Sequence, residues 1–181
     1  MKNFAFAILV LYAFLLCLAG YKLFLVATHP IKYQAEIIEV ATENNISPSL
    51  VASVVNTESS FRANARSTKN ALGLMQIKLS TAEYLCELYG LEKVNESKLL
   101  NPSTNLQFGC LYLKYLNEKF NNIWTSLAAY NAGETRVRVW LNNSQFSNDR
   151  KTLTKIPYKE TEQYIKKIKL NLKFYKKVFN K

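Results

Sequence analysis

The chain contains very few of the residues that metal centres and nucleophilic triads require. Among 181 residues there is one histidine, His29, and one aspartate, Asp149. The three cysteines, Cys17, Cys86 and Cys110, lie far apart and lack the clustered spacing of a metal-binding motif. A serine or cysteine nucleophile would need an imidazole base, which only His29 could provide. We therefore expect no metal ion, no other cofactor and no nucleophilic triad, so the chemistry must rest on other groups.

The sequence also lacks strand alternation, internal repeats, low-complexity tracts and an interdomain linker. The length and the hydrophobic content of 49% are sufficient for one domain with a real core but hardly for two. We expect a mainly α fold, with a single domain over residues 33–181.

The N-terminus begins with an apolar run. Residues 4–19 carry no charge, and apolar character resumes at residues 23–27 after Lys22. This pattern is typical of an export signal, and the whole stretch is long enough to span a bilayer. We expect residues 1–27 to be a signal peptide or a membrane anchor, with cleavage near Ala19 and Gly20 left open. Leu16 is large for a lipoprotein signal, which disfavours lipidation of Cys17.

Export would place the remaining two cysteines where disulfides persist. Cys86 and Cys110 could pair, but each also lies on an apolar helical pattern, where free cysteine packs as a small hydrophobe. Both alternatives stay open at this point.

The chain carries a net charge of +11, with much of the excess near the C-terminus. This excess suggests a polyanionic partner, and for an exported protein cell-wall polymers or anionic lipids fit better than nucleic acid. The alternative is a solvated helix face, because a core stripe is present at Tyr164, Ile165, Ile168, Leu172 and Tyr175. The lysines in question are Lys151, Lys155, Lys159, Lys166, Lys167, Lys169, Lys173, Lys176, Lys177 and Lys181.

Start and stop signals divide the rest of the chain into helices. Ser80 to Glu83 form a capping box for a helix that Gly90 can end, and Asn101 with Pro102 opens another. The expected helices cover residues 34–44, residues 48 to about 59, residues 80–89, residues 102–120, residues 124–131, residues 135–141 and a long basic stretch after residue 157.

One carboxylate, Glu58, continues an apolar helical stripe. Val51, Val54 and Val55 precede it by seven, four and three residues, and Pro48 after Ser47 marks the start of the helix. Glu58 should therefore lie near the helix C-terminus, where partial burial and the negative end of the helix dipole both disfavour its charged form. A carboxylic acid that keeps its proton near neutral pH is suited to general acid catalysis.

Four motifs resemble those of the soluble lytic transglycosylase family. They are ESSF at residues 58–61, ARSTKNALGLMQI at 65–77, AAYNAG at 128–133 and IPYKETEQYI at 156–165. They occur in the family's order over roughly residues 46–165. The resemblance implies a lysozyme-like domain, similar to goose-type lysozyme, that cleaves peptidoglycan glycan strands in the periplasm or cell envelope, with inner-membrane anchoring left open.

The resemblance also assigns site residues. The catalytic glutamate of the family falls on Glu58, the residue that helical geometry selects independently. Positions implied to contact substrate fall on Ser67, Gln76, Tyr130, Asn131 and Glu160. Tyr130 could steady a sugar ring or the Glu58 carboxyl. The sequence departs from the family where Asn70 replaces a glycine, Leu79 a common proline, and Lys78 a hydrophobic or uncharged polar residue.

The implied reaction uses one carboxyl group twice. Ordinary glycosidases use two carboxylates, and this sequence offers one convincing candidate. By resemblance, Glu58 protonates the oxygen between MurNAc and GlcNAc and then accepts a proton from the MurNAc C6 hydroxyl, which gives a 1,6-anhydro product. The alternatives are a hydrolytic muramidase and a non-catalytic wall-binding component of a secretion machine.

Overall fold

The computed structural model describes the backbone of residues 2–179 and the side chains of residues 9–24 and 27–179. The chain divides into two compact units, residues 1–31 and 32–181. The first consists mainly of α1 (Lys2–Thr28), in which the side chains of residues 9–24 are all exposed. Among the described residues, no helix reaches the length and apolarity that crossing a membrane requires. Part of the expected signal or anchor lies outside the described side chains, and it stays a prediction.

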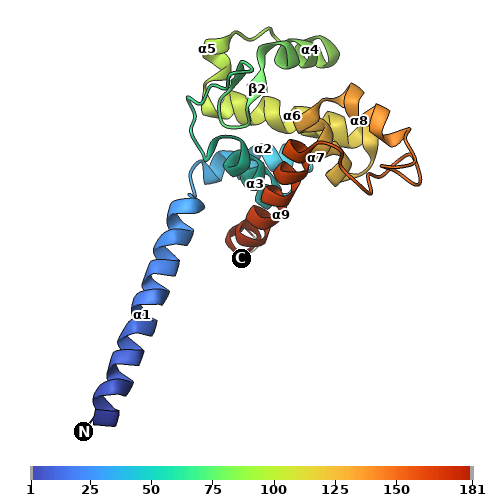
Figure 1. Cartoon of the computed structure of the whole chain (residues 1–181). Helices are drawn as coiled ribbons and strands as arrows, with labels where there is room; N and C mark the ends of the chain where they lie inside the picture. Colours follow the sequence, from blue (N-terminus) through green and yellow to red (C-terminus); the bar gives the residue numbers. More distant parts are fainter. Residues whose placement is uncertain (1, 180–181) are drawn as a thin grey trace. The chain divides into compact units, whose positions relative to one another are not determined.

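The second unit is mainly helical, as the sequence predicts (Figure 1). The elements of this unit are α2 (Gln34–Glu43), α3 (Pro48–Ser59), β1 (Ala71–Leu72), β2 (Ile77–Lys78), α4 (Leu79–Tyr89), α5 (Glu96–Leu99), α6 (Pro102–Phe120), α7 (Ile123–Ala132), α8 (Glu134–Leu141) and α9 (Lys159–Phe179). The long helix α6 packs against α2, α4, α5 and α7, while α9 packs on α3 and α7.

The helix boundaries follow their capping residues closely. Pro48 occupies the first turn of α3, and Ser60 ends the helix in a left-handed conformation at φ 52°. The Asn101 side chain accepts a hydrogen bond from the Thr104 amide at the start of α6. The capping-box prediction is wrong at Ser80, since α4 begins one residue earlier, after extended Lys78. Gly90 ends α4 as expected.

A short hairpin, which the sequence did not predict, follows α3. Strands β1 and β2 are antiparallel and contain two residues each, with Ala71 opposite Lys78 and Leu72 opposite Ile77. A hairpin this small is not stable alone. The fully buried Asn105 of α6 supports it, because its Oδ1 accepts from the Met75 amide (2.7 Å) and its Nδ2 donates to the Leu72 carbonyl (2.8 Å) and the Leu99 carbonyl (2.7 Å).

Gly73, at the turn of this hairpin, allows Asn105 to approach. Its φ is +76°, and a Cβ at this position would lie 2.3 Å from Asn105 Nδ2. Both the backbone angle and the close contact exclude larger side chains. Asn70 also has positive φ (58°), and asparagine, like the glycine found here in the family that the sequence resembles, tolerates this conformation.

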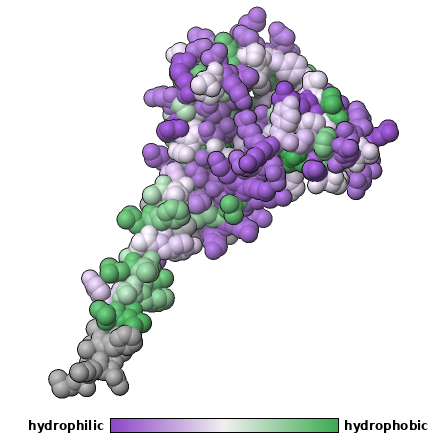
Figure 2. Space-filling view, in the orientation of Figure 1, coloured by the Kyte–Doolittle hydropathy of each residue, from purple (hydrophilic) through white to green (hydrophobic). Residues whose placement is uncertain are grey.

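Helix α3 forms the centre of the core. Nine of its twelve residues are buried, including Val51, Val54 and Val55. On α9, Tyr164, Ile165, Ile168 and Tyr175 are buried. Polar side chains dominate the face of the second unit seen in Figure 2. Four of the five residues of the predicted core stripe of α9 are therefore confirmed as buried, and the fifth, Leu172, is partly buried against the core.

The open question of a disulfide is settled in favour of free thiols. Cys86 and Cys110 are both buried and unpaired with each other, and Cys86 Sγ lies 3.1 Å from the Glu92 carbonyl oxygen. Burial raises the pKa of the Cys110 thiol to about 12, which keeps it protonated.

Candidate functional site

All six residues that the sequence singled out line one cavity of about 590 Å³. They come from four separate parts of the second unit: the end of α3, the hairpin region, α7, and the start of α9. The residues are Glu58, Ser67, Gln76, Tyr130, Asn131 and Glu160.

Glu58 lies in the last turn of α3 and is only partly exposed. Burial raises the pKa of its carboxyl from 4.5 to about 7, and the nearby Tyr164 hydroxyl partly opposes this by favouring the charged form. The negative end of the α3 dipole acts in the same direction as burial. A large fraction of Glu58 is therefore protonated at neutral pH.

Tyr164 is a neighbour of Glu58 whose sequence pattern predicted only a place in the core. The residue is 7% exposed, and its hydroxyl is the one buried side-chain polar atom in the described part of the chain without a hydrogen-bond partner of good geometry. Burial, the negative charge of ionised Glu58 and the nearby Tyr130 raise its pKa well above its ordinary value. Its position within an apolar α9 stripe gave no signal of the contact with Glu58.

Tyr130 of α7 places its ring in the cavity wall, but its hydroxyl is already bonded. It donates to the Met75 carbonyl oxygen at 2.8 Å. The ring packs on Tyr112 of α6, with centroids 5.2 Å apart. The Tyr130 hydroxyl therefore donates its proton to Met75 and not to the Glu58 carboxyl, while the residue itself lines the cavity.

Gln76 adopts a left-handed backbone with φ 52° at the end of the hairpin turn. Its Nε2 donates to the Gly73 carbonyl (2.9 Å) and the Ala65 carbonyl (3.2 Å). These two bonds hold the side chain in place. No described residue donates to Oε1, so this oxygen is the atom of Gln76 available to accept a hydrogen bond from a ligand in the cavity.

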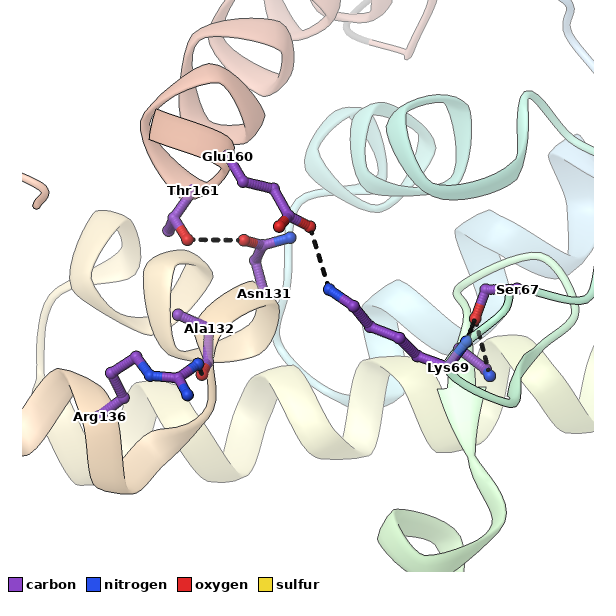
Figure 3. A network of polar contacts seen from close by, with 8 residues as sticks. Ser67, Lys69, Asn131, Ala132, Arg136, Glu160 and Thr161 are labelled. Carbon is purple, nitrogen blue, oxygen red and sulfur yellow. Dashed lines mark hydrogen bonds and ion pairs between the residues drawn. The ribbon is translucent and has the colours of Figure 1, made fainter. Parts of the chain in front are cut away.

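Ser67 organises the loop before β1. Its Oγ accepts from the amides of Lys69 (3.2 Å) and Ala71 (3.0 Å), as Figure 3 shows. With two bonds accepted, the hydroxyl still has its own proton to donate to a ligand.

On the opposite side of the cavity, the residues of α7 and α9 are joined. Asn131 Oδ1 accepts from the Thr161 hydroxyl at 2.8 Å. The Glu160 carboxylate points toward Lys69 of the hairpin region, and the two form an ion pair at 3.5 Å (Figure 3). Glu160 is 72% exposed, which makes its environment very different from that of Glu58.

Known proteins share this sequence pattern and this architecture. The family described as "Transglycosylase SLT domain" matches residues 36–153. The soluble lytic murein transglycosylase of Salmonella typhimurium is 34% identical over 142 residues, which cover 77% of this chain and 22% of that protein. The membrane-bound lytic murein transglycosylase C of Histophilus somni is 34% identical over 129 residues, which cover 65% of this chain and 36% of that protein.

Solved structures of similar proteins share the fold. The lytic transglycosylase Slt of Pseudomonas aeruginosa, in an inactive variant with glutamine in place of a glutamate, superposes with a TM-score of 0.76 at 28% identity, covering 86% of this chain and 26% of that one. The 70-kDa soluble lytic transglycosylase in complex with bulgecin A gives a TM-score of 0.75 at 30% identity, covering 84% of this chain and 25% of that one.

The chain thus spans about a fifth to a quarter of the length of the soluble relatives and structures that it matches. The match to the family at residues 36–153 covers most of the second unit and all of the residues that line the cavity except Glu160. The chain belongs to the transglycosylase SLT domain family.

Proposed function

We propose that the chain is a peptidoglycan lytic transglycosylase in which Glu58 acts first as general acid and then as general base. The observation that carries the proposal is the environment of Glu58, a carboxyl that faces a cavity and has a pKa raised to about 7. Catalytic acid–base groups work best with a pKa near the working pH. Lytic murein transglycosylases are also the relatives that match most of the chain.

In the first step, protonated Glu58 donates its proton to the glycosidic oxygen between MurNAc and GlcNAc as the C1–O bond breaks. The substrate's own acetamide stabilises the positive charge that develops at C1. A second enzyme carboxylate is not needed for this. Among the described residues that line the cavity, Glu160 is the only other acid, and it is largely exposed.

In the second step, ionised Glu58 accepts the proton of the MurNAc C6 hydroxyl. The C6 oxygen then bonds to C1 and closes a 1,6-anhydro ring, and Glu58 is protonated again for the next cycle. Atoms balance without water, since the proton lost from C6–OH replaces the one given to the leaving GlcNAc. The inactive glutamate-to-glutamine variant of a structural relative supports an essential role for a glutamate.

The other residues of the cavity would position the sugars. The Tyr130 ring offers an apolar face to a pyranose, Gln76 Oε1 and the Ser67 hydroxyl offer an acceptor and a donor, and Asn131 and Glu160 would bind hydroxyl or acetamide groups. Together they would hold MurNAc with its C1 next to Glu58. The proposed reaction would take place in the cell envelope, where peptidoglycan lies. Both the soluble and the membrane-bound murein transglycosylases among the relatives agree with this location.

Digestion of purified sacculi in H₂¹⁸O tests the proposal. The wild-type protein should release muropeptides that end in 1,6-anhydroMurNAc without ¹⁸O, and Glu58→Gln should release almost none. Reducing-end products that carry one ¹⁸O would make the enzyme a hydrolase. A wild-type protein that binds sacculi but releases nothing would make it a wall-binding component.

A further inference from the structure

The cavity around Glu58 contains three cationic side chains that catalysis at Glu58 does not use. Lys69, Lys78 and Arg136 all line it, against two acids, Glu58 and Glu160. All three cations are exposed to solvent. This excess of positive charge points to a substrate with negative groups.

Lys69 and Lys78 both lie at the end of the hairpin that is opposite its turn. Lys78 pairs with Ala71 in the sheet, and Ala71 follows Lys69 by two residues. Both lysines line the same cavity, and an anion bound there would be attracted by both charges. Lys78 has no ion-pair partner among the described residues, and it is one of the positions at which this chain departs from its family.

The partner of Lys69 is easily exchanged. Its pair with Glu160 is long, at 3.5 Å, and both side chains are at least 70% exposed (Figure 3). Exposed pairs of this kind contribute little to stability. A ligand carboxylate can therefore replace Glu160 as the partner of Lys69 at small cost.

Arg136 supplies a more rigid positive charge from α8. Its Nη1 donates to the Ala132 carbonyl at 2.9 Å, and its guanidinium lies 5.0 Å from the centre of the Tyr158 ring. These contacts fix the side chain and use one of its five N–H donors, so the others remain for a carboxylate. The cavity therefore presents cations both from the hairpin edge and from α8.

We propose that Lys69, Lys78 and Arg136 bind the carboxylates of the peptide stems attached to MurNAc, so that the enzyme prefers stem-bearing strands. The inference rests on the proposed function, because it names the substrate of the same cavity. The three cations act as specificity residues, and the bond-breaking step still belongs to Glu58.

The test measures binding to the full-length Glu58→Gln protein, so that no turnover interferes. The probe is one soluble glycan oligomer of defined length with its peptide stems, used either unmodified or with the stem carboxylates converted to methylamides. Each exposed charge contact is expected to change affinity by about two- to fivefold. Amidation of the probe should therefore weaken binding by roughly tenfold, and the difference should shrink as salt increases.

Variants connect this difference to the three residues. Lys69→Gln with Lys78→Gln should weaken binding of the unmodified probe and leave the amidated probe nearly unchanged, and Arg136→Gln should add to the loss. Lys69→Arg should keep the preference, because it keeps the charge. Lys93→Gln is the matched control, since Lys93 is exposed and does not line the cavity.

Equal affinity for the two probes would overturn the inference, and so would a loss in Lys69→Gln that is the same for both probes. If a variant fails to fold, as judged by its thermal melting, the comparison of probes on the parent protein decides alone. Release of anhydro products by the wild type with no effect of amidation would sink only this inference. Absence of those products would instead sink the proposed function.

Discussion

The cavity receives a glutamate from each of two helices, and the two glutamates differ in almost every physical respect. Glu58 comes from the C-terminal end of α3, in the buried core, where burial raises its pKa to about 7. Glu160 comes from the first turn of α9, is 72% exposed and pairs with Lys69. The residue type is the same, and the position in the fold decides which one can keep a proton for catalysis.

The two ends of a helix also differ in their effect on a carboxylate. The C-terminal end of α3 disfavours negative charge at Glu58, whereas the N-terminal end of α9 favours it at Glu160. Glu160 is therefore suited to hold a lysine or a substrate donor, and Glu58 to exchange protons.

The largest expected effect comes from replacing each glutamate by glutamine. Glu58→Gln should lower the rate of anhydro-muropeptide release by at least ~10⁴-fold, because one group serves both proton transfers. Glu160→Gln keeps Glu58 in place and should lower kcat/KM by no more than about tenfold, through one lost contact of roughly 1 kcal/mol. Rates of product release from purified sacculi measure both effects. Equal losses in the two variants would contradict the different roles proposed for Glu58 and Glu160.

The hairpin that closes the cavity depends on Asn105 and Gly73. Gly73→Ala should destabilise the protein by about 2–4 kcal/mol, because the new methyl group would collide with the buried Asn105 side chain at a positive φ. Asn105→Ala should cost a similar amount, since it leaves buried backbone groups without partners.

Denaturant unfolding measures these losses, with Gly90→Ala as the control for positive φ without a clash. Gly90 has φ +65°, and a Cβ there would meet no atom within 4 Å. If Gly73→Ala were no worse than Gly90→Ala, the packing of Asn105 would not be what supports the hairpin.

Glu58 should also lower stability at neutral pH. Its pKa is higher in the folded chain than its ordinary value of 4.5, so the folded state binds the proton more tightly. The contribution of Glu58 to the free energy of unfolding should therefore be greatest below pH 4.5, fall as the pH rises toward 7, and level off above it. Glu58→Gln removes this dependence and should be more stable than the wild type at pH 8 by up to about 3 kcal/mol.

Melting temperatures at pH 4 and pH 8 report this effect. Glu160→Gln is the comparison, because an exposed pair contributes at most ~1 kcal/mol. A Glu58→Gln protein that melts below the wild type at pH 8 would contradict the unfavourable environment of the carboxyl.

The smallest expected change concerns Tyr164. Its hydroxyl favours ionised Glu58, so Tyr164→Phe should raise the Glu58 pKa further. The activity of the wild type should decline above about pH 7, where Glu58 loses its proton, and the decline in Tyr164→Phe should begin at higher pH. Tyr158→Phe, at an exposed tyrosine that does not line the cavity, should leave the profile in place.

Much of this arrangement could be predicted from local patterns. The spacing of valines before Glu58, the proline at the start of α3 and the glycine after α4 are short-range signals, and the helices follow them. The six site residues could be predicted to lie together because their motifs occur in the order found in a known family.

The remainder depends on contacts between distant residues. Asn105 looks like an ordinary helix residue in the sequence, and only its position under the hairpin reveals its three hydrogen bonds. Periodicity likewise does not predict that the Tyr164 hydroxyl lies near Glu58 or that Tyr130 bonds to Met75. An aromatic residue on an apolar stripe is predicted only to pack in the core. The Ser80 cap failed because extended Lys78 continues directly from β2 into α4.

The role of Glu58 is tested most directly by the pKa of its carboxyl. Titration of ¹³C-labelled glutamate side chains by NMR, with the Glu58 signal assigned by its loss in Glu58→Gln, gives this value without substrate. The proposed mechanism requires a pKa near 7 in the wild type. A value near the ordinary 4.5 would contradict it, because the carboxyl would then be ionised at neutral pH and could not begin the reaction as an acid.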